Sequence, residues 1–455
     1  MPFPFTLPTT SSISLADFFT SSTHPSLLLT ATTHRSVLRD TLKKHKRLAP
    51  SSQSSHLSTI QDAINTYLPF LFVLNAGLQN RPIAGQPILV SPTKELEVEW
   101  RTTISSSIPG REPARIKLKG LHNELAFVLQ TLAYVQTHLA RVQLALLHKA
   151  DQDHRAAAIS TAMKYLLEAN SIHSYILSVP NRGSGNPMPV DTAPSTQAAL
   201  ASLALAEATL IVVLKDDPYA AAVAEDRNKE NKDWMFRAPS IPNQAYGSLQ
   251  RSASTGGRIT EDLSRYVDDL QRTARAKACR FLGIDAELSG KIGDGLAWLR
   301  GAKKEMGLAV VEEEKGKKGL KGLKQSWVEK REDRRVEKGK EGWGMDAGKF
   351  EESRVVEWLE GKWTKENDTI NYQIVPSFEP LLATMPSGRE YHTPKPFTPR
   401  ELDPDVLARM RAPPDPNDNA FQGNEEDSDA EGHATSSNPP GAFPEHDYGS
   451  GSSYY

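Results

Sequence analysis

A change of hydrophobic period between residues 95 and 149 constrains the fold of this chain more than any other feature. Apolar and charged residues alternate over 96–101, and they alternate again over 115–119 after a turn at Pro109-Gly110. From 121 to 146 the apolar residues recur in steps of three and four, which is the spacing along one face of an α-helix. The pattern predicts a β-hairpin that leads into a long helix, and such a helix must pack against neighbours. We interpret this combination as typical of an interaction protein rather than of an enzyme core.

Helical spacing of apolar residues recurs along most of the chain as far as residue 385. The predicted fold class is therefore mainly α, with a small β-hairpin near the N-terminal third, and the helical array is irregular because no repeat of fixed period is present. Residues 1–33 are rich in Ser, Thr and Pro, and we expect an extended segment that lies on the domain. The predicted helices cover 34–48, 57–78, 121–146, 155–179, 196–215, 219–227, 259–282, 290–306 and 346–362.

The composition changes at Pro386. Residues 386–455 are rich in Pro, Ser and Gly and carry 13 acidic against 5 basic residues. Such a segment buries too little apolar area to offset the entropy that is lost on ordering. We therefore predict one folded domain over 1–385 and a disordered acidic tail over 386–455. Within the tail, Ser428 is flanked by acidic residues and is a candidate phosphorylation site for an acidophilic kinase.

The formal net charge of −2 gives no general case for nucleic acid or an anionic membrane as a partner. The highly charged stretch 312–341 leaves two interpretations open, a solvated loop and helix or a segment that touches a partner or a membrane. The best candidate for a membrane span, 198–214, contains Glu207 and is too short, so we expect a buried helix. The N-terminus has no signal-peptide pattern. Any association with a membrane should then be peripheral or through partners.

Motifs for a phosphate-binding loop, a serine nucleophile or a zinc protease are absent from the sequence, and we expect no catalytic residue, metal or cofactor. The histidines are scattered, and the spacing of His138, His148 and His154 puts no pair on one helix face. The single cysteine, Cys279, excludes an intramolecular disulfide and fits a reducing cytosol or nucleus. Basic neighbours would lower the pKa of this thiol. An enzyme with a site on Cys279 or on the histidines therefore stays open as an alternative.

Four segments, in order along the chain, resemble motifs of the BRO domain found in ALIX-like adaptors. Within that family, the stretches TARAKACRFLGIDAEL, KREDRRVEKGK and MPSGREYHTPKPF resemble fungal proteins of the pH response. The four segments are ELAFVL at 124–129, LAEA at 205–208 with VVLK at 212–215, FLGID at 281–285 with AWL at 297–299, and NDTI at 367–370 with VP at 375–376.

The resemblance implies a curved helical BRO domain over 1–385 with a central tetratricopeptide-like array. A convex apolar groove of that domain would bind the C-terminal amphipathic helix of a Snf-seven-type ESCRT-III subunit, burying apolar anchors at helical spacing. Carried over by position, the groove residues are Val212, Val213 and Val223. Core packing is the alternative for each valine, since buried helices are rich in such residues.

The resemblance also implies a non-catalytic scaffold in fungal ambient-pH signalling. Arrestin-like and calpain-like proteins act in that pathway, which ends in proteolytic activation of a zinc-finger transcription factor. The scaffold would be cytoplasmic and recruited to endosomal membranes or to cortical plasma-membrane sites. The alternative within the same fold is a general endosomal-sorting adaptor that recruits a deubiquitinase to ESCRT-III. The residues alone support only a helical interaction protein with a disordered acidic tail.

Overall fold

The chain divides into two compact units, Met1–Arg411 and Ala412–Tyr455, and every element named below belongs to the first. The computed structural model describes residues 1–83, 85–105, 112–147, 152–179, 188–217, 219, 259–308, 344–386, 388 and 391–413. Ser428 and the charged stretch 312–341 lie outside these residues, as do the turn at Pro109-Gly110 and nearly all of the predicted helix 219–227.

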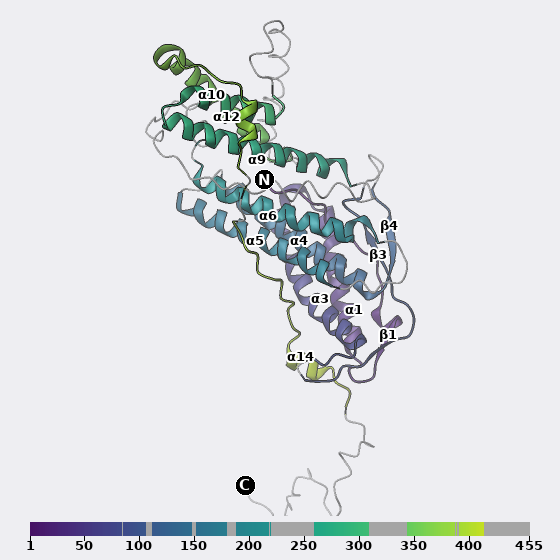
Figure 1. Ribbon diagram of the computed structural model, residues 1–455. Coiled ribbons are helices and arrows are strands. Elements are labelled where there is room, and N and C mark those ends of the chain that lie inside the picture. The colour runs from purple at the N-terminus through teal and green to yellow at the C-terminus, as the bar shows by residue number, and fades with distance from the viewer. Residues whose placement is uncertain are drawn as a thin grey trace, which may run out of the picture. The chain divides into compact units, whose positions relative to one another are not determined.

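Helices make up most of the described part of the first unit, which confirms the predicted fold class (Figure 1). Short 3₁₀ turns, η1 (Leu15–Asp17), η2 (Ser54–His56) and η3 (Val190–Thr192), and a π-helical turn, η6 (Asn367–Asn371), connect them. The helices are α1 (Leu27–Arg47), α2 (Pro50–Gln53), α3 (Leu57–Leu78), α4 (Leu121–Leu146), α5 (Gln152–Ser178), α6 (Pro194–Asp216), α9 (Glu261–Leu288), α10 (Ile292–Glu305), α12 (Lys349–Glu366), α13 (Glu379–Ala383) and α14 (Pro404–Arg409).

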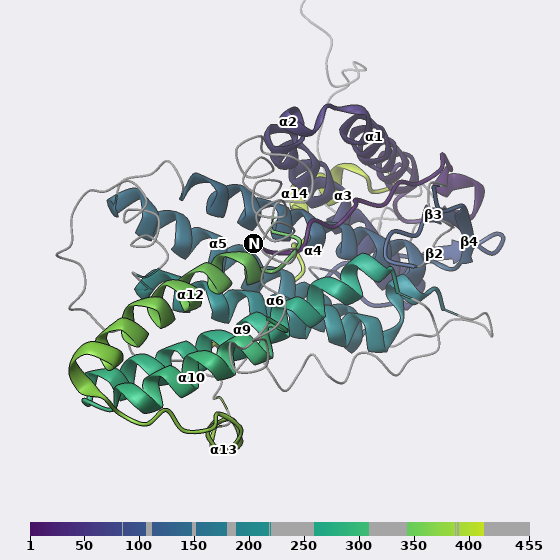
Figure 2. The ribbon, with the colours of Figure 1, turned by 90° about the horizontal axis from the view of Figure 1, so that it is seen from above.

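Each long helix packs on the next one along the chain. α1 contacts α3, α3 contacts α4, α4 contacts α5 and α5 contacts α6. Helices α9, α10 and α12 pack on one another and run side by side (Figure 2). The main apolar core lies among α1, α3, α4 and the inner parts of α5, α6 and α9, and a second core lies within the α9–α10–α12 group. The chain is thus an array in which local sequence neighbours are also spatial neighbours.

The β-hairpin forms where alternation predicts it. Strand β3 (Glu97–Arg101) pairs with β4 (Arg115–Lys119) in antiparallel register, with Val98 opposite Leu118 and Trp100 opposite Ile116. The apolar side of β3 is buried in the main core, and its charged side is not. A second antiparallel pair, β1 (Phe19–Ser21) with β2 (Val90–Pro92), joins the N-terminal segment to the chain after α3.

A buried ion pair fastens this hairpin to the helices. The Glu124 carboxylate accepts hydrogen bonds from Arg35 Nε at 2.8 Å, Trp100 Nε1 at 2.7 Å and Tyr67 Oη at 3.2 Å. All four side chains are buried, and they come from α4, α1, β3 and α3. Burial of a charge is tolerated only when it is paired and fully hydrogen-bonded, so Glu124 connects four elements at once.

The N-terminal segment differs from the expectation of a stretch that lies on the domain. Phe3, Phe5 and Leu7 are buried in the main core, and the Phe5 ring stacks on Tyr134 of α4 at 4.2 Å. Helix formation also starts earlier than predicted, at Leu27 rather than 34. The pattern of Pro and Ser signals the absence of regular structure here, but large aromatic side chains still gain from burial.

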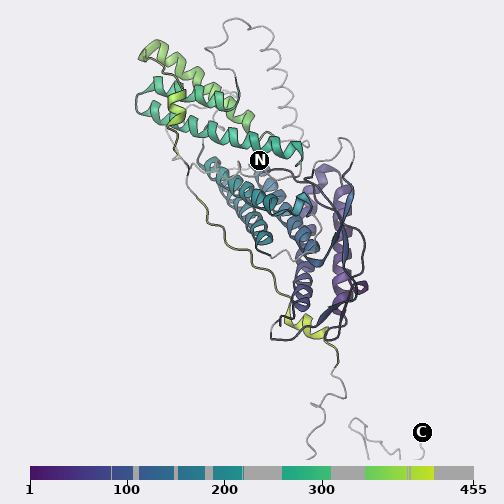
Figure 3. The same ribbon diagram turned by 45° about the vertical axis from the view of Figure 1, so that its right-hand side comes forward.

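The part of 386–455 that is described departs from the predicted tail. After α13, residues 391–403 run back along the array and lead to α14, which is drawn in yellow-green at the far end (Figure 3). Leu402, Leu407 and Met410 are buried in the main core, and the Asp403 carboxylate accepts a hydrogen bond from the Asp405 amide at the start of α14. Proline and charge prevent long helices in this stretch, but a few well-spaced apolar residues suffice to hold it.

Helix α6 passes a length-and-composition test for a membrane span over Pro194–Val213, yet 67% of that window is buried inside the structure. This agrees with the expected buried helix. The remaining long helices begin and end within a few residues of the predicted bounds, except that α9 continues to Leu288 rather than 282.

Candidate functional site at the end of helix α6

Helix α6 is the element on which the sequence places the candidate groove. Pro194 occupies its first turn, where a missing amide hydrogen is tolerated, and the helix is apolar nearly all round, as a helix buried between neighbours should be. Its one buried carboxylate, Glu207, accepts hydrogen bonds from Tyr266 Oη of α9 at 2.7 Å and from the Phe3 amide at 3.0 Å. Burial raises the pKa of Glu207, and these donors oppose the rise.

The last turns of α6 are buried on more than one side. Val213 is 7% exposed and belongs to the second core, together with residues of α9, α10 and α12. Ile211 belongs to a third apolar cluster with residues of α4 and α5, and Val212 is 9% exposed. The structure therefore brings Val212 and Val213 together at the edge of the packed interior. Val223 lies outside the described residues, so the predicted trio stays a prediction.

A cluster of buried charges lies directly after α6. Arg280 of α9 bonds Asp217 through Nη2 at 2.5 Å and Glu352 of α12 through Nε at 2.6 Å. Lys277 Nζ lies 2.5 Å from the other oxygen of Glu352. The side chains of Arg280, Asp217 and Glu352 are at most 1% exposed. We call these four residues the Arg280 cluster.

Electrostatics within the Arg280 cluster hold both carboxylates ionised. Burial by itself raises the pKa of Asp217 and of Glu352, but the adjacent Arg280 guanidinium outweighs burial and lowers both pKa values. The guanidinium also lies over the rings of Phe281 and Tyr219, at 4.4 Å and 5.5 Å from their centroids. The cluster fixes the point where the chain leaves α6 and enters the segment that carries Val223.

A second apolar surface lies on the closing motif, and the sequence gave no interpretation of it beyond resemblance. Ile370, Tyr372 and Ile374 are 71–91% exposed. The turn that carries them is held in place, because the Asn367 side chain bonds both the amide and the carbonyl of Gln373, and the Gln373 side chain donates to the Gly290 carbonyl at 2.8 Å. A rigid backbone thus presents three large apolar groups to solvent. Their alternation with polar residues in TINYQI was the signal that might have been noticed.

The alternative of an enzyme at Cys279 finds no support in the described residues. Cys279 is fully buried in the second core, and burial raises the pKa of its thiol to about 12. Its basic neighbours Arg275 and Arg280 are engaged with Glu305 and with the Arg280 cluster. A buried thiol with such a pKa holds almost no nucleophilic thiolate at neutral pH.

The histidines are placed for packing rather than for metal binding in the described part of the chain. His138 donates from Nε2 to the Phe5 carbonyl at 2.5 Å, and His173 donates from Nδ1 to the Gln197 side-chain oxygen at 2.7 Å. Burial lowers the pKa of each to about 4. Among the described residues no group of three or more His, Cys, Asp or Glu is arranged to hold a metal ion. His148 lies outside them.

Comparison with known proteins connects this architecture to a family. No protein-family model matches the chain. The sequence is 42% identical to the pH-response regulator protein palC of Emericella nidulans, over 98% of this chain and 98% of that protein.

Two solved structures have a similar fold. One is an ALIX BRO1 domain in complex with CHMP4C, with a TM-score of 0.51 and 14% identity over 89% of this chain and 96% of that one. The other is ALIX in complex with the SIVmac239 PYKEVTEDL late domain, with a TM-score of 0.54 and 14% identity over 88% of this chain. This chain spans about half, 49%, of the length of that ALIX chain.

The structural likeness confirms the predicted BRO-type fold, a helical unit with two small antiparallel sheets. The sequence identity extends over nearly the whole of both proteins, so it covers the array, the Arg280 cluster and the closing motif together. The chain therefore belongs to the family of the pH-response regulator protein palC, and its fold is that of the ALIX BRO1 domain.

Proposed function

We propose that this chain is a non-catalytic adaptor in ambient-pH signalling that binds the C-terminal helix of a Snf-seven-type ESCRT-III subunit. The observation that carries the signalling role is the 42% identity to palC over 98% of the chain. The fold supports helix binding, since a BRO1 domain of the same fold was solved in complex with CHMP4C. The buried, protonated thiol of Cys279 is consistent with an adaptor that performs no chemistry.

The end of α6 supports the location of the binding surface. Met163 and Leu167 of α5 are half-buried and pack against the cluster that contains Ile211. They offer apolar surface beside Val212, and an amphipathic helix laid along α5 and the end of α6 would cover it. The Arg280 cluster would hold that end of α6 in a fixed position, which reduces the entropy lost on binding.

The partners and the location of the adaptor follow from the same proposal. The Snf-seven-type subunit would be the direct partner, and arrestin-like and calpain-like proteins of the pathway would join the complex directly or through it. The adaptor would be cytoplasmic and reach endosomal or cortical membranes through these partners rather than through its own lipid contacts.

Fluorescence-polarisation titration of a labelled peptide, the C-terminal helix of the organism's own Snf-seven-type subunit, tests the proposal. Wild type should bind with a Kd in the micromolar range, about −8 kcal/mol. Leu167→Glu should weaken binding at least tenfold, since it places a charge on half-buried apolar surface. Leu29→Glu is the matched control, because Leu29 is an exposed leucine of α1 in another part of the array.

We avoid Val213→Asp as the test, because Val213 lies in the core and the change would unfold the end of α6. Both variants should retain the helical circular-dichroism spectrum of wild type. Absence of peptide binding by folded wild type would remove the helix-binding part of the proposal. Equal binding by Leu167→Glu and Leu29→Glu would move the surface away from α5.

A further inference from the structure

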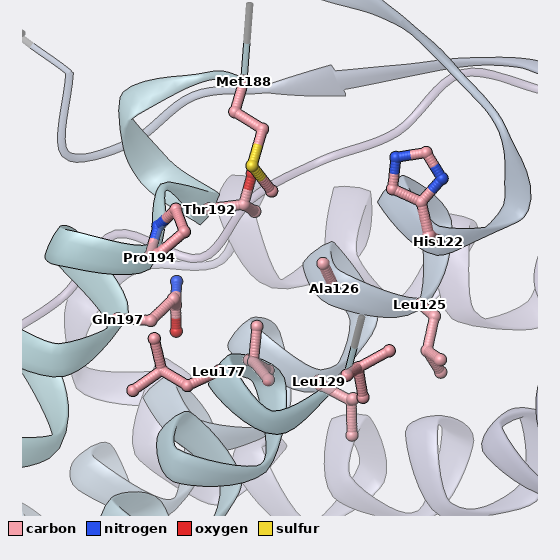
Figure 4. A pocket seen from close by; sticks show the side chains of 11 residues that line it. His122, Leu125, Ala126, Leu129, Leu177, Met188, Thr192, Pro194 and Gln197 are labelled. Carbon is pink, nitrogen blue, oxygen red and sulfur yellow. The ribbon is translucent and has the colours of Figure 1, made fainter. Parts of the chain in front are cut away.

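A pocket of about 210 Å³ lies at the start of α6, and nothing in the proposed helix-binding role uses it (Figure 4). Leu125 and Leu129 of α4 and Ile176 and Leu177 of α5 supply apolar side chains to its lining. Figure 4 shows Met188 and Thr192 on one side of the pocket and Leu129 and Leu177 on the facing side. The far end of α6, with Val213, is about 24 Å away along the helix axis.

One polar atom in this apolar lining has no partner. Thr192 is 1% exposed, and within the described residues its Oγ1 makes no hydrogen bond. The other buried polar side chain of the lining, Gln197, is fully engaged, since its oxygen accepts from His173 and its nitrogen donates to the Asp191 carbonyl at 2.7 Å. Buried hydroxyls are rarely left unpaired, so Thr192 Oγ1 marks where a ligand's polar atom belongs.

The size and chemistry of the pocket define what fits. An apolar cavity of about 150 Å³ already accommodates a benzene molecule, so this pocket has room for one substituted aromatic ring. A single water molecule is a poor occupant, because a buried water needs two to four polar partners and only Thr192 offers one here. The matching group is an aromatic ring with one hydroxyl that reaches Thr192.

The mouth of the pocket favours a ligand that continues along the surface. Leu177 is 40% exposed at the rim, and Val179 beside it is only half-buried. A free phenol inside the pocket would leave these side chains in water, whereas a peptide that carries the ring would cover them. His122, also at the pocket, is neutral at physiological pH because burial lowers its pKa, so the mouth carries no fixed charge from it.

We propose that this pocket binds a tyrosine side chain presented by a partner protein, with the ring among Leu125, Leu129 and Leu177 and the phenol hydroxyl bonded to Thr192 Oγ1. The binding is separate from the helix-binding surface at the other end of α6. The proposal stands or falls independently of ESCRT-III binding.

Two small probes test the chemistry on the full chain. By isothermal titration or by chemical-shift titration, 4-methylphenol should bind about fivefold more tightly than toluene, which lacks only the hydroxyl. Thr192→Val should abolish this preference, since it replaces the hydroxyl by a methyl group of the same shape. Thr273→Val is the matched control, because Thr273 is also buried with an unpaired Oγ1 but lies on α9, away from the pocket.

A second arm distinguishes a protein ligand from a free phenol. N-acetyl-Leu-Tyr-amide should bind more tightly than 4-methylphenol, and Leu177→Ser should weaken the dipeptide without affecting the phenol. Ala126→Phe, which fills the pocket, should block both. Circular dichroism and thermal melting verify that each variant is folded.

The proposal is overturned if wild type shows no preference for 4-methylphenol over toluene, or if Thr192→Val retains that preference. Binding of 4-methylphenol that no dipeptide improves would overturn the assignment of a protein ligand.

Discussion

Replacement of Arg280 by methionine tests whether the Arg280 cluster holds the end of α6. Met has a similar length but no charge, so Asp217 and Glu352 would remain buried at 1% and 0% exposure with only Lys277 to neutralise them. Removing one partner of a buried ion pair costs about 3–5 kcal/mol, because the charge that stays behind has no compensation. We expect Arg280→Met to lower the free energy of unfolding by that amount, a large share of the roughly 5–15 kcal/mol that stabilises a typical protein.

The penalty should depend on pH with a definite sign. In wild type the pKa values of Asp217 and Glu352 are lowered, so their contribution is present above the unfolded pKa and is lost as pH falls through the folded pKa. Without Arg280, burial instead raises these pKa values, and the carboxyls take up protons more readily in the folded state. The difference in stability between wild type and Arg280→Met should therefore narrow between neutral pH and about pH 4.

Urea unfolding followed by circular dichroism, at neutral pH and near pH 4.5, measures both effects. Arg265→Met is the control, since Arg265 pairs with Glu261 on the exposed face of α9 and should contribute about 0.3–0.5 kcal/mol. Arg280→Lys retains the charge without the two-pronged geometry and should fall between wild type and Arg280→Met, which keeps the test informative if the methionine variant does not fold. A loss no larger than that of the control, or a difference that does not change with pH, would refute the reasoning.

Three further predictions follow from other buried groups. Glu124→Gln should destabilise the chain by about 3–5 kcal/mol in urea unfolding, since it leaves the Arg35 guanidinium buried without a countercharge, and a loss below 1 kcal/mol would argue against the role of this hub. His173 has a folded pKa of about 4, so its contribution to stability should be lost as pH falls from about 6.5 towards 4, and His173→Gln should flatten that part of the stability profile; an unchanged slope would contradict the prediction. Cys279 should react with a thiol reagent at pH 8 only after urea unfolding, and rapid reaction of the native chain would show that the second core opens.

The sequence by itself determined the elements whose cause is local. Alternation over 96–101 and 115–119 specifies the hairpin, because one face of each strand must be apolar. The steps of three and four over 121–146 specify α4, because only helical spacing gathers those residues on one side. Pro180 and the break at Asp216-Asp217-Pro218 set the ends of α5 and α6. Quoted motifs, and not periodicity, led to the family.

The tertiary structure decided everything that depends on residues far apart in the chain. Spacing cannot show that Arg280 meets Asp217 and Glu352, since 63 and 72 residues separate them from it. Composition marks 391–411 as tail-like, yet Leu402 and Leu407 find space in a core built by helices hundreds of residues earlier. The burial of Val213 and the unpaired hydroxyl of Thr192 likewise depend on which helices surround them, and local sequence carries no information about those neighbours.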